Sequence, residues 1–273
     1  MKLSIVARHL PEREGTATGR ALRALVDGLF AEGHEVDVWS WSPDPPAGEL
    51  PGWCTWRPLP AEPWMRMKAR ALMRPRDDAA IAGWRPAEGA IPMADDPVCF
   101  PAVAPFRHNV LVQHYLAKID LRVLGERGLP TVQSFRAERR YVRQADVALA
   151  FSERVASGMR RLVTVVPIAY EPPDRVLEPV DRPVAVMLAN WRWPPNLAAL
   201  RTLVDVWPDV SDRVAGARLL IAGRGIVPDA VGSLRGVEVV GEVARVEDVL
   251  CRAAVVAFPC PPTSGPKVKV IEA

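Results

Sequence analysis

The first 39 residues of the chain contain the pattern that most restricts its fold. Lys2–Ala7 is a short apolar run with strand character, and a polar loop at 11–19 follows it. Apolar residues then recur with the spacing of an amphipathic helix: Leu22, Leu25, Val26, Leu29 and Phe30. Gly33 ends this helix as a C′ glycine would, and Glu35–Trp39 predicts a second strand. A βαβ unit requires a parallel sheet, so the sequence predicts an α/β fold.

Strand and helix patterns continue after a stretch that is difficult to assign. Residues 43–106 are rich in proline and tryptophan, and within them only 65–73 has a helical pattern. Downstream, the patterns predict these elements in order: strand 109–113, helix 132–144, strand 146–151, helix 152–162 capped by Ser152, and strand 163–167.

A second series of elements begins after residue 183. Residues 171–183 hold four prolines and little periodicity, which predicts an interdomain linker. The elements expected beyond it are strand 184–189, helix 196–206, strand 218–222, strand 237–240, helix 246–252 and strand 254–258. A final helix has barely begun at Ala273. We therefore expect two Rossmann-like domains, residues 1–170 and 184–273, with the second incomplete at its C-terminus.

The composition is that of a globular protein, with 49% hydrophobic and 25% charged residues. A membrane span is not expected, because no run of about 18 apolar residues occurs, and the N-terminus lacks the pattern of a signal peptide. Four scattered cysteines without a CxxC pair predict reduced thiols in a cytoplasmic protein. The net charge is only +3, and neither zinc-finger spacing nor a basic stretch with interleaved aromatics occurs. The sequence therefore predicts no metal and no nucleic-acid partner.

Four arginines cluster in the predicted helix 132–144: Arg136, Arg139, Arg140 and Arg143. Such a cluster can bind a phosphate or an anionic lipid. A solvated helix face is the alternative, and it is the more common meaning of such a charge pattern. Peripheral contact with the inner face of a membrane therefore stays open.

The C-terminal stretch 259–273 carries the clearest indication of chemistry. An apolar strand runs into a loop of small residues and then into a helix with Pro266 in its first turn. A helix N-terminus at the carboxyl end of a parallel strand presents unpaired N–H groups to a diphosphate. Gly265 permits a close backbone approach, and Glu272 can accept hydrogen bonds from sugar hydroxyls. A purely structural loop is the alternative.

This stretch resembles the signature of glycosyltransferase family 4, in which a small-residue loop precedes a Lys-x-x-Glu-Ala helix start. Other segments resemble that family in order and spacing: 186–196 with its Trp-Pro-Pro-Asn element, 217–225 with its Gly-Arg-Gly turn, 237–243, 33–36, 143–146 and 151–154. The resemblance covers nearly the whole chain and is weak only between residues 43 and 130. It implies the GT-B fold, with two Rossmann-like domains facing a cleft. It also implies transfer of a sugar from a nucleotide diphosphate-sugar to an acceptor with retention.

The resemblance also implies a donor site without a further cofactor. It places the loop Ser264, Gly265, Pro266 and Lys267 at the diphosphate, with Gly15 and Thr16 facing the phosphates. It places Glu272 at the ribose and the backbone near Val243 at the base. The sequence departs from the pattern of family 4 at two places. Ser264 replaces the first of two acidic residues eight apart, and the usual Arg and Lys fall near Asn190 and Asn196. Arg192, Arg224 or Lys269 is expected to supply the missing positive charge. The acceptor stays open between a glycan, a lipid-linked sugar and a small molecule.

The histidines give one catalytic candidate, His114, which follows a predicted strand roughly where the family sometimes carries a cleft histidine. His9 follows the first strand and can reach the same kind of carboxyl-end site. His34, in a Gly-His-Glu turn, is expected to be structural. A satisfied or solvent-exposed histidine is the alternative at each position.

Other protein classes fit the sequence less well. A Rossmann dehydrogenase needs G-x-G-x-x-G after the first strand, and Gly15 and Gly19 have the wrong spacing for it. No Walker A motif occurs, nor does the Asp-x-Asp of a metal-dependent GT-A transferase. A sugar-nucleotide epimerase of the same fold stays open. So does a truncated, catalytically inactive GT-B-like protein that acts as a binding module.

Overall fold

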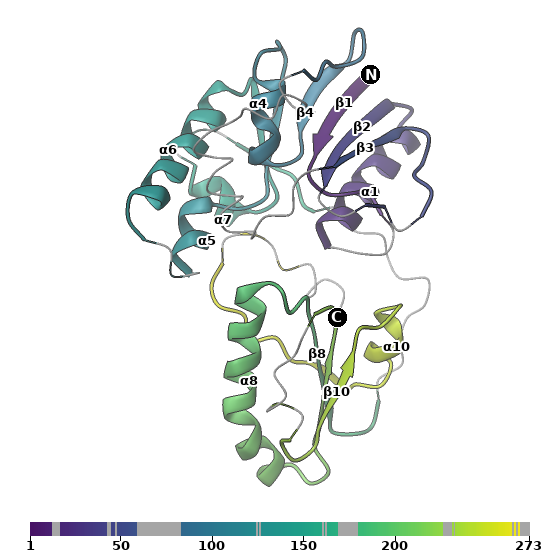
Figure 1. The fold of residues 1–273 in the computed structure, drawn as a ribbon, viewed down its shortest axis with the longest axis vertical. Coiled ribbons are helices and arrows are strands. Elements are labelled where there is room, and N and C mark those ends of the chain that lie inside the picture. The colour runs from purple at the N-terminus through teal and green to yellow at the C-terminus, as the bar shows by residue number, and fades with distance from the viewer. Residues whose placement is uncertain are drawn as a thin grey trace. The chain divides into compact units, whose positions relative to one another are not determined.

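The computed structural model of the chain describes residues 1–12, 17–42, 45–46, 48–58, 83–123, 125, 127–159, 161, 163–168, 180–225, 231, 233–263, 265 and 267. The chain divides into two compact units, each a parallel sheet flanked by helices (Figure 1). Unit 1 comprises Met1–Pro172 and Ser264–Pro266, and unit 2 comprises Pro173–Thr263 and Lys267–Ala273. Most of the predicted linker, residues 171–179, lies outside the described part of the chain.

Unit 1 contains a parallel sheet whose described strands have the order β3-β2-β1-β4-β5-β6-β7. The strands are β1 (Lys2–Ala7), β2 (Glu35–Ser42), β3 (Cys54–Pro58), β4 (Ile91–Ala94), β5 (Val110–Gln113), β6 (Val147–Ala150) and β7 (Thr164–Val165). Both faces of the sheet are covered, which explains why every residue of β1 from Leu3 to Ala7 is buried, Ser4 included. Ile5 packs with Leu22 and Val26 on one face, whereas Val6 belongs to the core of the other face.

The helices of unit 1 divide between the two faces. Helix α1 (Ala17–Ala31) covers the face that contains Ile5. The other face packs against α4 (Phe100–Val103), α5 (Ala117–Val123), α6 (Leu129–Gln144) and α7 (Glu153–Ser157), and the short helix η1 (Pro97–Cys99) precedes α4. Phe100 and Leu121 are almost fully buried in this second core.

Unit 2 contains a smaller parallel sheet with the order β10-β9-β8-β11. Its elements are β8 (Val184–Leu188), α8 (Pro194–Arg213), β9 (Arg218–Ala222), β10 (Val237–Gly241), α10 (Glu247–Leu250) and β11 (Val255–Val256). Helix α8 packs Leu200 and Trp207 against one face of the sheet. Helix α10 packs Val249 against the other face.

Most predicted elements are present with shifted ends. Helix α6 begins at Leu129, three residues before the predicted start, because Gly128 adopts a φ of 87° and Pro130 fits the first turn. Helix α7 ends at Ser157 rather than 162, although Ser152 caps it as predicted. Helix α8 runs from 194 to 213, well beyond the predicted 196–206. The predicted helices at 65–73 and at the end of the chain lie outside the described residues.

The sequence patterns missed two strands, β3 and β4, within the stretch 43–106. Strand β4 pairs with β1 and β5, so it is a central strand, yet it has only four residues and one of them is Pro92. A proline inside a short run normally argues against a central strand.

None of the described helices combines the length and the apolar character that crossing a bilayer requires.

Candidate active site

The strand order of unit 1 predicts a ligand-binding crevice at one edge of its sheet. From β1 the chain moves to β2 on one side, and β4 then lies on the other side of β1. In open parallel sheets, ligands bind at the carboxyl ends of strands where the order reverses in this way. The side chains that follow β1, β4 and β5 are His9, Asp95 and His114. The topology therefore gathers three titratable groups at one sheet edge.

His114 and Asp95 form the central pair of this group. Nε2 of His114 lies 3.2 Å from Oδ1 of Asp95, and the His114 side chain is only 12% exposed. The imidazole ring also packs edge-on against Phe151, with ring centroids 4.5 Å apart. Burial alone would lower the pKa of His114, but the charge and hydrogen bond of Asp95 outweigh burial and raise it. His114 is therefore an oriented imidazole that retains its proton more readily than a free histidine.

Asp95 has one carboxylate oxygen to spare. The residue is 1% exposed, and no donor among the described residues reaches its Oδ2 atom. Burial raises the pKa of Asp95, and the neighbouring His114 partly opposes that rise. A buried acceptor without a partner is costly, and a hydrogen bond from a water molecule or from a ligand hydroxyl would offset that cost.

Neighbouring polar groups hold the loop after β5 in place. The hydroxyl of Tyr115 donates to Oδ1 of Asp96 at 3.2 Å, and Asp96 also accepts the backbone N–H of Val98 at 2.7 Å. Nε2 of Gln113 donates to the carbonyl oxygen of Tyr115 at 2.6 Å and to Oε1 of Glu138 at 2.7 Å. These bonds fix the backbone on both sides of His114.

His9 is the third titratable group at this edge, and its burial predicts that the folded protein is less stable at acidic pH. Its pKa is lowered from 6.5 to about 4, mainly by burial and further by the charges of Arg8 and His114, with Asp96 opposing the shift. Between these two pKa values the unfolded chain binds a proton that the folded chain does not, so stability is lost as the pH falls. Lowering the pH from 7 to 4 should therefore reduce the free energy of unfolding of the wild type by about 3 kcal/mol more than that of His9→Gln.

Urea denaturation at a series of pH values measures this effect. His108→Asn is the matched control, because His108 is exposed and asparagine tolerates its positive φ of 59°. The control should follow the wild-type pH dependence. A His9→Gln variant that loses stability in acid as steeply as the wild type would show that His9 accepts a proton in the folded protein.

Unit 2 has the same reversal of strand order, which predicts a second crevice between β8 and β11. From β8 the chain moves to β9 and β10 on one side, and β11 lies on the other. The loops that follow these two strands therefore flank the position where a ligand is expected. One loop carries Arg192, and the other carries Thr263.

The loop that carries Arg192 is held by two asparagines. Nδ2 of Asn196 donates to the carbonyl oxygen of Asn190 at 2.8 Å, and Oδ1 of Asn190 accepts the backbone N–H of Arg192 at 3.0 Å. Trp191 adds a backbone bond to the carbonyl of Arg224 at 2.8 Å. The Arg192 side chain is exposed and has no ion-pair partner among the described residues. This arrangement leaves its guanidinium available to an anion.

Two of the other predicted donor residues follow the strands β9 and β10. Arg224 lies 3.9 Å from Oε1 of Glu242, with both side chains more than half exposed, which is a weak interaction. Val243 is half-buried and packs with the core that contains Val186. Its position after β10 leaves its backbone at the carboxyl edge of the sheet.

The second loop of the crevice is described only in part. The ammonium of Lys267 donates to the hydroxyl of Thr263, which is buried. Gly265 groups with unit 1, and a Cβ atom on it would lie 2.9 Å from the carbonyl oxygen of His114. The other predicted donor residues lie outside the described part of the chain: Gly15, Thr16, Ser264, Pro266, Lys269 and Glu272.

Sequence reasoning found His114 but missed Asp95, Asp96 and Tyr115. The available signal was Asp95-Asp96 directly after the apolar run 91–94. Paired carboxylates at the carboxyl end of a parallel strand indicate a site. Because Pro92 argues against a strand at 91–94, the sequence patterns did not place the two aspartates at the end of a strand.

Comparisons with known proteins agree with this architecture. Residues 182–273 match the sequence profile of the family described as Glycosyl transferases group 1. A structure of a mutant TarM from S. aureus, with fondaparinux, α-GlcNAc-glycerol and UDP, aligns with all of the chain at a TM-score of 0.65 and 8% identity, over 83% of its own length. The chain has the GT-B fold.

Further structural matches also have low sequence identity to the chain. The lipopolysaccharide outer core galactosyltransferase WaaB, in its apo form, aligns with 92% of the chain at a TM-score of 0.51 and 13% identity, over 70% of its own length. Another TarM structure aligns with 67% of the chain at a TM-score of 0.54 and 14% identity, and there the chain spans only 38% of the TarM length. No curated protein matches the chain in sequence. The structural matches show the fold, and the family match covers residues 182–273.

Proposed function

We propose that this GT-B chain transfers a sugar from a nucleotide diphosphate-sugar to an acceptor, with retention of the anomeric configuration. One observation carries the proposal. The crevice between β8 and β11, with the exposed Arg192 on one side and Thr263 and Lys267 on the other, lies inside the segment that matches Glycosyl transferases group 1. Retention rests on the resemblance of the sequence motifs to family 4.

The donor site is proposed to act by electrostatic stabilisation of the leaving diphosphate. Arg192 and Lys267 supply positive charge from the two loops that flank the crevice. Oriented charges of this kind stabilise a developing phosphate anion without reorganising during the reaction. The backbone near Val243 is proposed to contact the base, and Glu272 the ribose.

In unit 1, His114 is proposed to act on the transferred sugar or the acceptor. Asp95 pairs with Nε2 of its imidazole and raises the pKa of His114, which favours the ring as a hydrogen-bond donor. The free Oδ2 atom of Asp95 offers an acceptor beside it. A donor and an acceptor at neighbouring positions suit the recognition of a hydroxyl group.

A thermal-shift titration of the full chain with UDP, GDP and dTDP tests the donor site. UDP is the first choice, because the TarM structure of the same fold contains it. We expect one nucleotide to raise the melting temperature at concentrations above its Kd, since a ligand that binds only the folded state stabilises it. The absence of any shift in a cooperatively folded sample would contradict the proposed donor site.

Arg192→Gln tests the cation of that site. Losing one hydrogen-bonded charge at a diphosphate should weaken nucleotide binding at least about 10-fold, without changing the melting temperature of the free protein. Isothermal titration calorimetry measures the Kd. Arg201→Gln is the matched control, because Arg201 is exposed on α8 of the same unit. Equal Kd values for Arg192→Gln and the wild type would remove Arg192 from the site.

The stereochemical outcome can be followed without knowing the acceptor. We expect water to act as a slow acceptor at the proposed site, and proton NMR distinguishes the anomers of the released sugar. We expect the first sugar released to have the same anomeric configuration as the donor. Release of the opposite anomer would contradict retention, and conversion of the donor into an epimer would indicate a sugar-nucleotide epimerase instead.

Location and acceptor are also part of the proposal. The four cysteines are free, and Cys54 and Cys99 are buried thiols, as expected for a protein that works in the cytoplasm. A glycan, a lipid-linked sugar and a small molecule are the acceptor classes to screen, once the thermal-shift titration has identified the nucleotide.

A further inference from the structure

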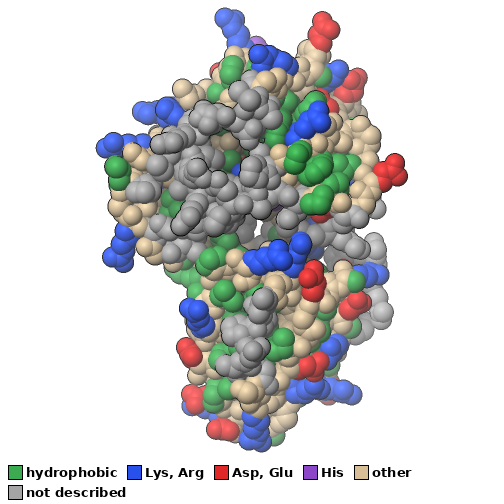
Figure 2. Space-filling view, viewed as in Figure 1, with side chains coloured by type: hydrophobic (Ala, Val, Ile, Leu, Met, Phe, Trp, Pro, Cys, Tyr) green, Lys and Arg blue, Asp and Glu red, His purple; other side chains and the backbone are tan. Residues whose placement is uncertain are grey.

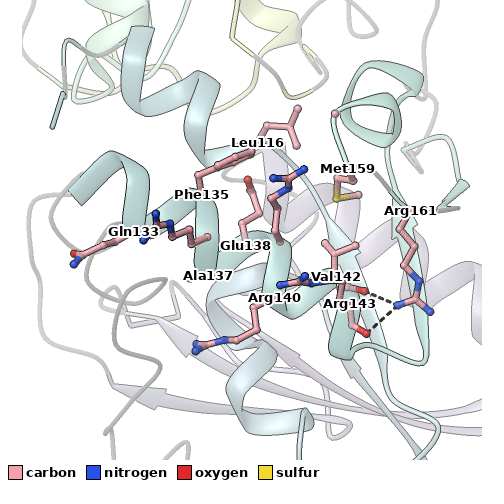
Figure 3. A pocket seen from close by; sticks show the side chains of 13 residues that line it. Leu116, Gln133, Phe135, Ala137, Glu138, Arg140, Val142, Arg143, Met159 and Arg161 are labelled. Carbon is pink, nitrogen blue, oxygen red and sulfur yellow. Dashed lines mark hydrogen bonds between the residues drawn. The ribbon is translucent and has the colours of Figure 1, made fainter. Parts of the chain in front are cut away.

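A pocket of about 770 Å³ opens beside α6 in unit 1. Its wall combines α6 with Leu116 from the loop after β5 and with the segment that follows α7 (Figure 3). Neither His114 nor Asp95 is among the described residues that line it. The pocket is therefore distinct from the candidate active site.

Arginine dominates the wall of this pocket, which we call the arginine pocket. Its arginines are Arg136, Arg139, Arg140, Arg143 and Arg161. The first four recur on α6 at spacings of three and four residues, so they share one side of the helix. In Figure 2 several Lys and Arg side chains project from the margin of unit 1 on the side where Figure 1 draws α6.

Arg161 has a structural role at the end of α6. Its guanidinium donates to the carbonyl oxygens of Val142 at 2.6 Å and Ala145 at 2.7 Å. Figure 3 draws the first of these bonds as a dashed line. These bonds satisfy carbonyl groups that the helix end leaves unpaired. The remaining four arginines belong to α6 itself and are the candidates for ligand binding.

The positive charge of these four arginines is not neutralised within the described part of the chain. Glu138 is the carboxylate in the described pocket wall, but it is 2% exposed. Its Oε1 atom already accepts from Nε2 of Gln113 at 2.7 Å and from the backbone of Ala117 at 2.8 Å. None of the four α6 arginines forms an ion pair with a described residue. Like charges at this helical spacing repel one another, so a bound anion would relieve that repulsion.

Aromatic rings hold two of the guanidinium groups in place. Cζ of Arg139 lies 4.8 Å from the ring centroid of Phe135, and Nζ of Lys118 lies 4.5 Å from the same centroid. Cζ of Arg140 lies 5.3 Å from the ring of Tyr141. Contacts of this kind restrict otherwise flexible side chains, which lowers the entropy cost of binding a ligand. The arrangement differs in this respect from a freely solvated helix face.

We propose that the arginine pocket binds an organic phosphate. Guanidinium groups match phosphate oxygens in a two-bond geometry that few other anions use as well. The volume falls within the range of about 300–1,000 Å³ typical of small-molecule sites, so a single inorganic phosphate would leave most of it empty. Leu116, Val142 and Met159 add apolar surface for the organic part of the ligand. A free organic phosphate and the head group of an anionic lipid share this chemistry.

Calorimetric titration of the full chain with sodium triphosphate at low salt tests the pocket. We expect saturable binding, and we expect the double variant Arg136→Gln, Arg143→Gln to weaken it at least about 10-fold. The matched control changes two exposed arginines of α8, Arg201→Gln with Arg213→Gln, and should bind triphosphate as the wild type does. Nucleotide affinity, measured on the same samples, should stay unchanged, because the proposed donor site is in unit 2.

Vesicle sedimentation separates the two sources of phosphate. Phosphatidylglycerol vesicles that retain the wild type but not the double variant, while phosphatidylcholine vesicles retain neither, would assign the pocket to a lipid head group. Triphosphate binding without retention by either vesicle would assign it to a free organic phosphate. Triphosphate binding that is equal in the wild type and the double variant would overturn the proposal, as would no binding to triphosphate or to either vesicle.

Discussion

Gly223→Ala is expected to lower the free energy of unfolding by about 4 kcal/mol, because no space exists for a side chain at this position. Gly223 follows β9 with a φ of 123°, a backbone conformation that residues other than glycine rarely adopt. A Cβ atom there would overlap the carbonyl oxygen of Ala189 and lie 2.8 Å from its carbonyl carbon. Because these atoms belong to the backbone, no rotamer change can relieve the overlap.

The overlap would also disturb the loop that carries Arg192. The backbone N–H of Ala189 donates to the carbonyl oxygen of Ala222 at 3.0 Å, and the N–H of Gly223 donates to that of Gly241 at 2.7 Å. Displacing Ala189 therefore loosens the carboxyl ends of β8, β9 and β10 together. Beyond the loss of stability, we expect weaker nucleotide binding and faster hydrogen exchange in the segment 184–193.

Urea denaturation followed by circular dichroism measures the change in stability. Gly216→Ala is the matched control, because Gly216 also has a positive φ, of 74°, but only a side-chain atom of Pro183 lies near it, at 3.9 Å. The control should lose only about 1–2 kcal/mol, the cost of a left-handed conformation for alanine. Equal losses in the two variants would show that the close approach to Ala189 is not rigid.

The fold was predictable wherever a periodic apolar pattern was bounded by clear turn residues. The first strand, the helix after it and the strand 218–222 match β1, α1 and β9, because each is a clear apolar pattern bounded by a turn. Strand β4 could not be found in this way. It is short and contains Pro92, and its place between β1 and β5 depends on tertiary pairing that local sequence does not encode.

Single residues of the candidate site could be predicted from the sequence, but their pairing could not. His114 is recognisable as a histidine after a strand, whereas its partner Asp95 lies 19 residues earlier in the chain and approaches it only through the order of the strands. The two asparagines that replace the usual Arg and Lys gave no positive signal either. Their role is visible only in the hydrogen bonds by which Asn196 and Asn190 support the Arg192 loop.

The two crevices are built by different means. In unit 2, glycines and backbone hydrogen bonds shape the loops, and the charges stand at their surface. In unit 1, buried side chains pair with one another, and a carboxylate oxygen is left over. A surface of backbone groups and exposed cations suits a diphosphate, whereas an imidazole paired with a carboxylate suits hydroxyl groups. This difference supports the proposal that the donor binds to unit 2 and that unit 1 acts on the transferred sugar or the acceptor.

His114→Gln is expected to lower kcat for release of the donor sugar by about 10²–10³-fold, the range for loss of one positioned hydrogen-bonding or proton-transferring group. The KM for the donor should change little, because nucleotide binding is assigned to unit 2. A continuous assay of nucleoside diphosphate release measures both constants. His34→Gln is the control, because His34 immediately precedes β2, at the amino edge of the sheet, and contacts the N-terminal amine.

Asp95→Asn separates positioning from catalysis at the same site. The charge of Asp95 raises the pKa of His114, so a reaction that needs protonated His114 loses activity as the pH rises through that pKa. Removing the charge lowers the pKa, and we expect the alkaline limb of the pH–rate profile to move to lower pH. A merely structural role for Asp95 would reduce kcat without moving that limb. An unchanged profile in Asp95→Asn, together with normal activity of His114→Gln, would exclude the pair from the reaction.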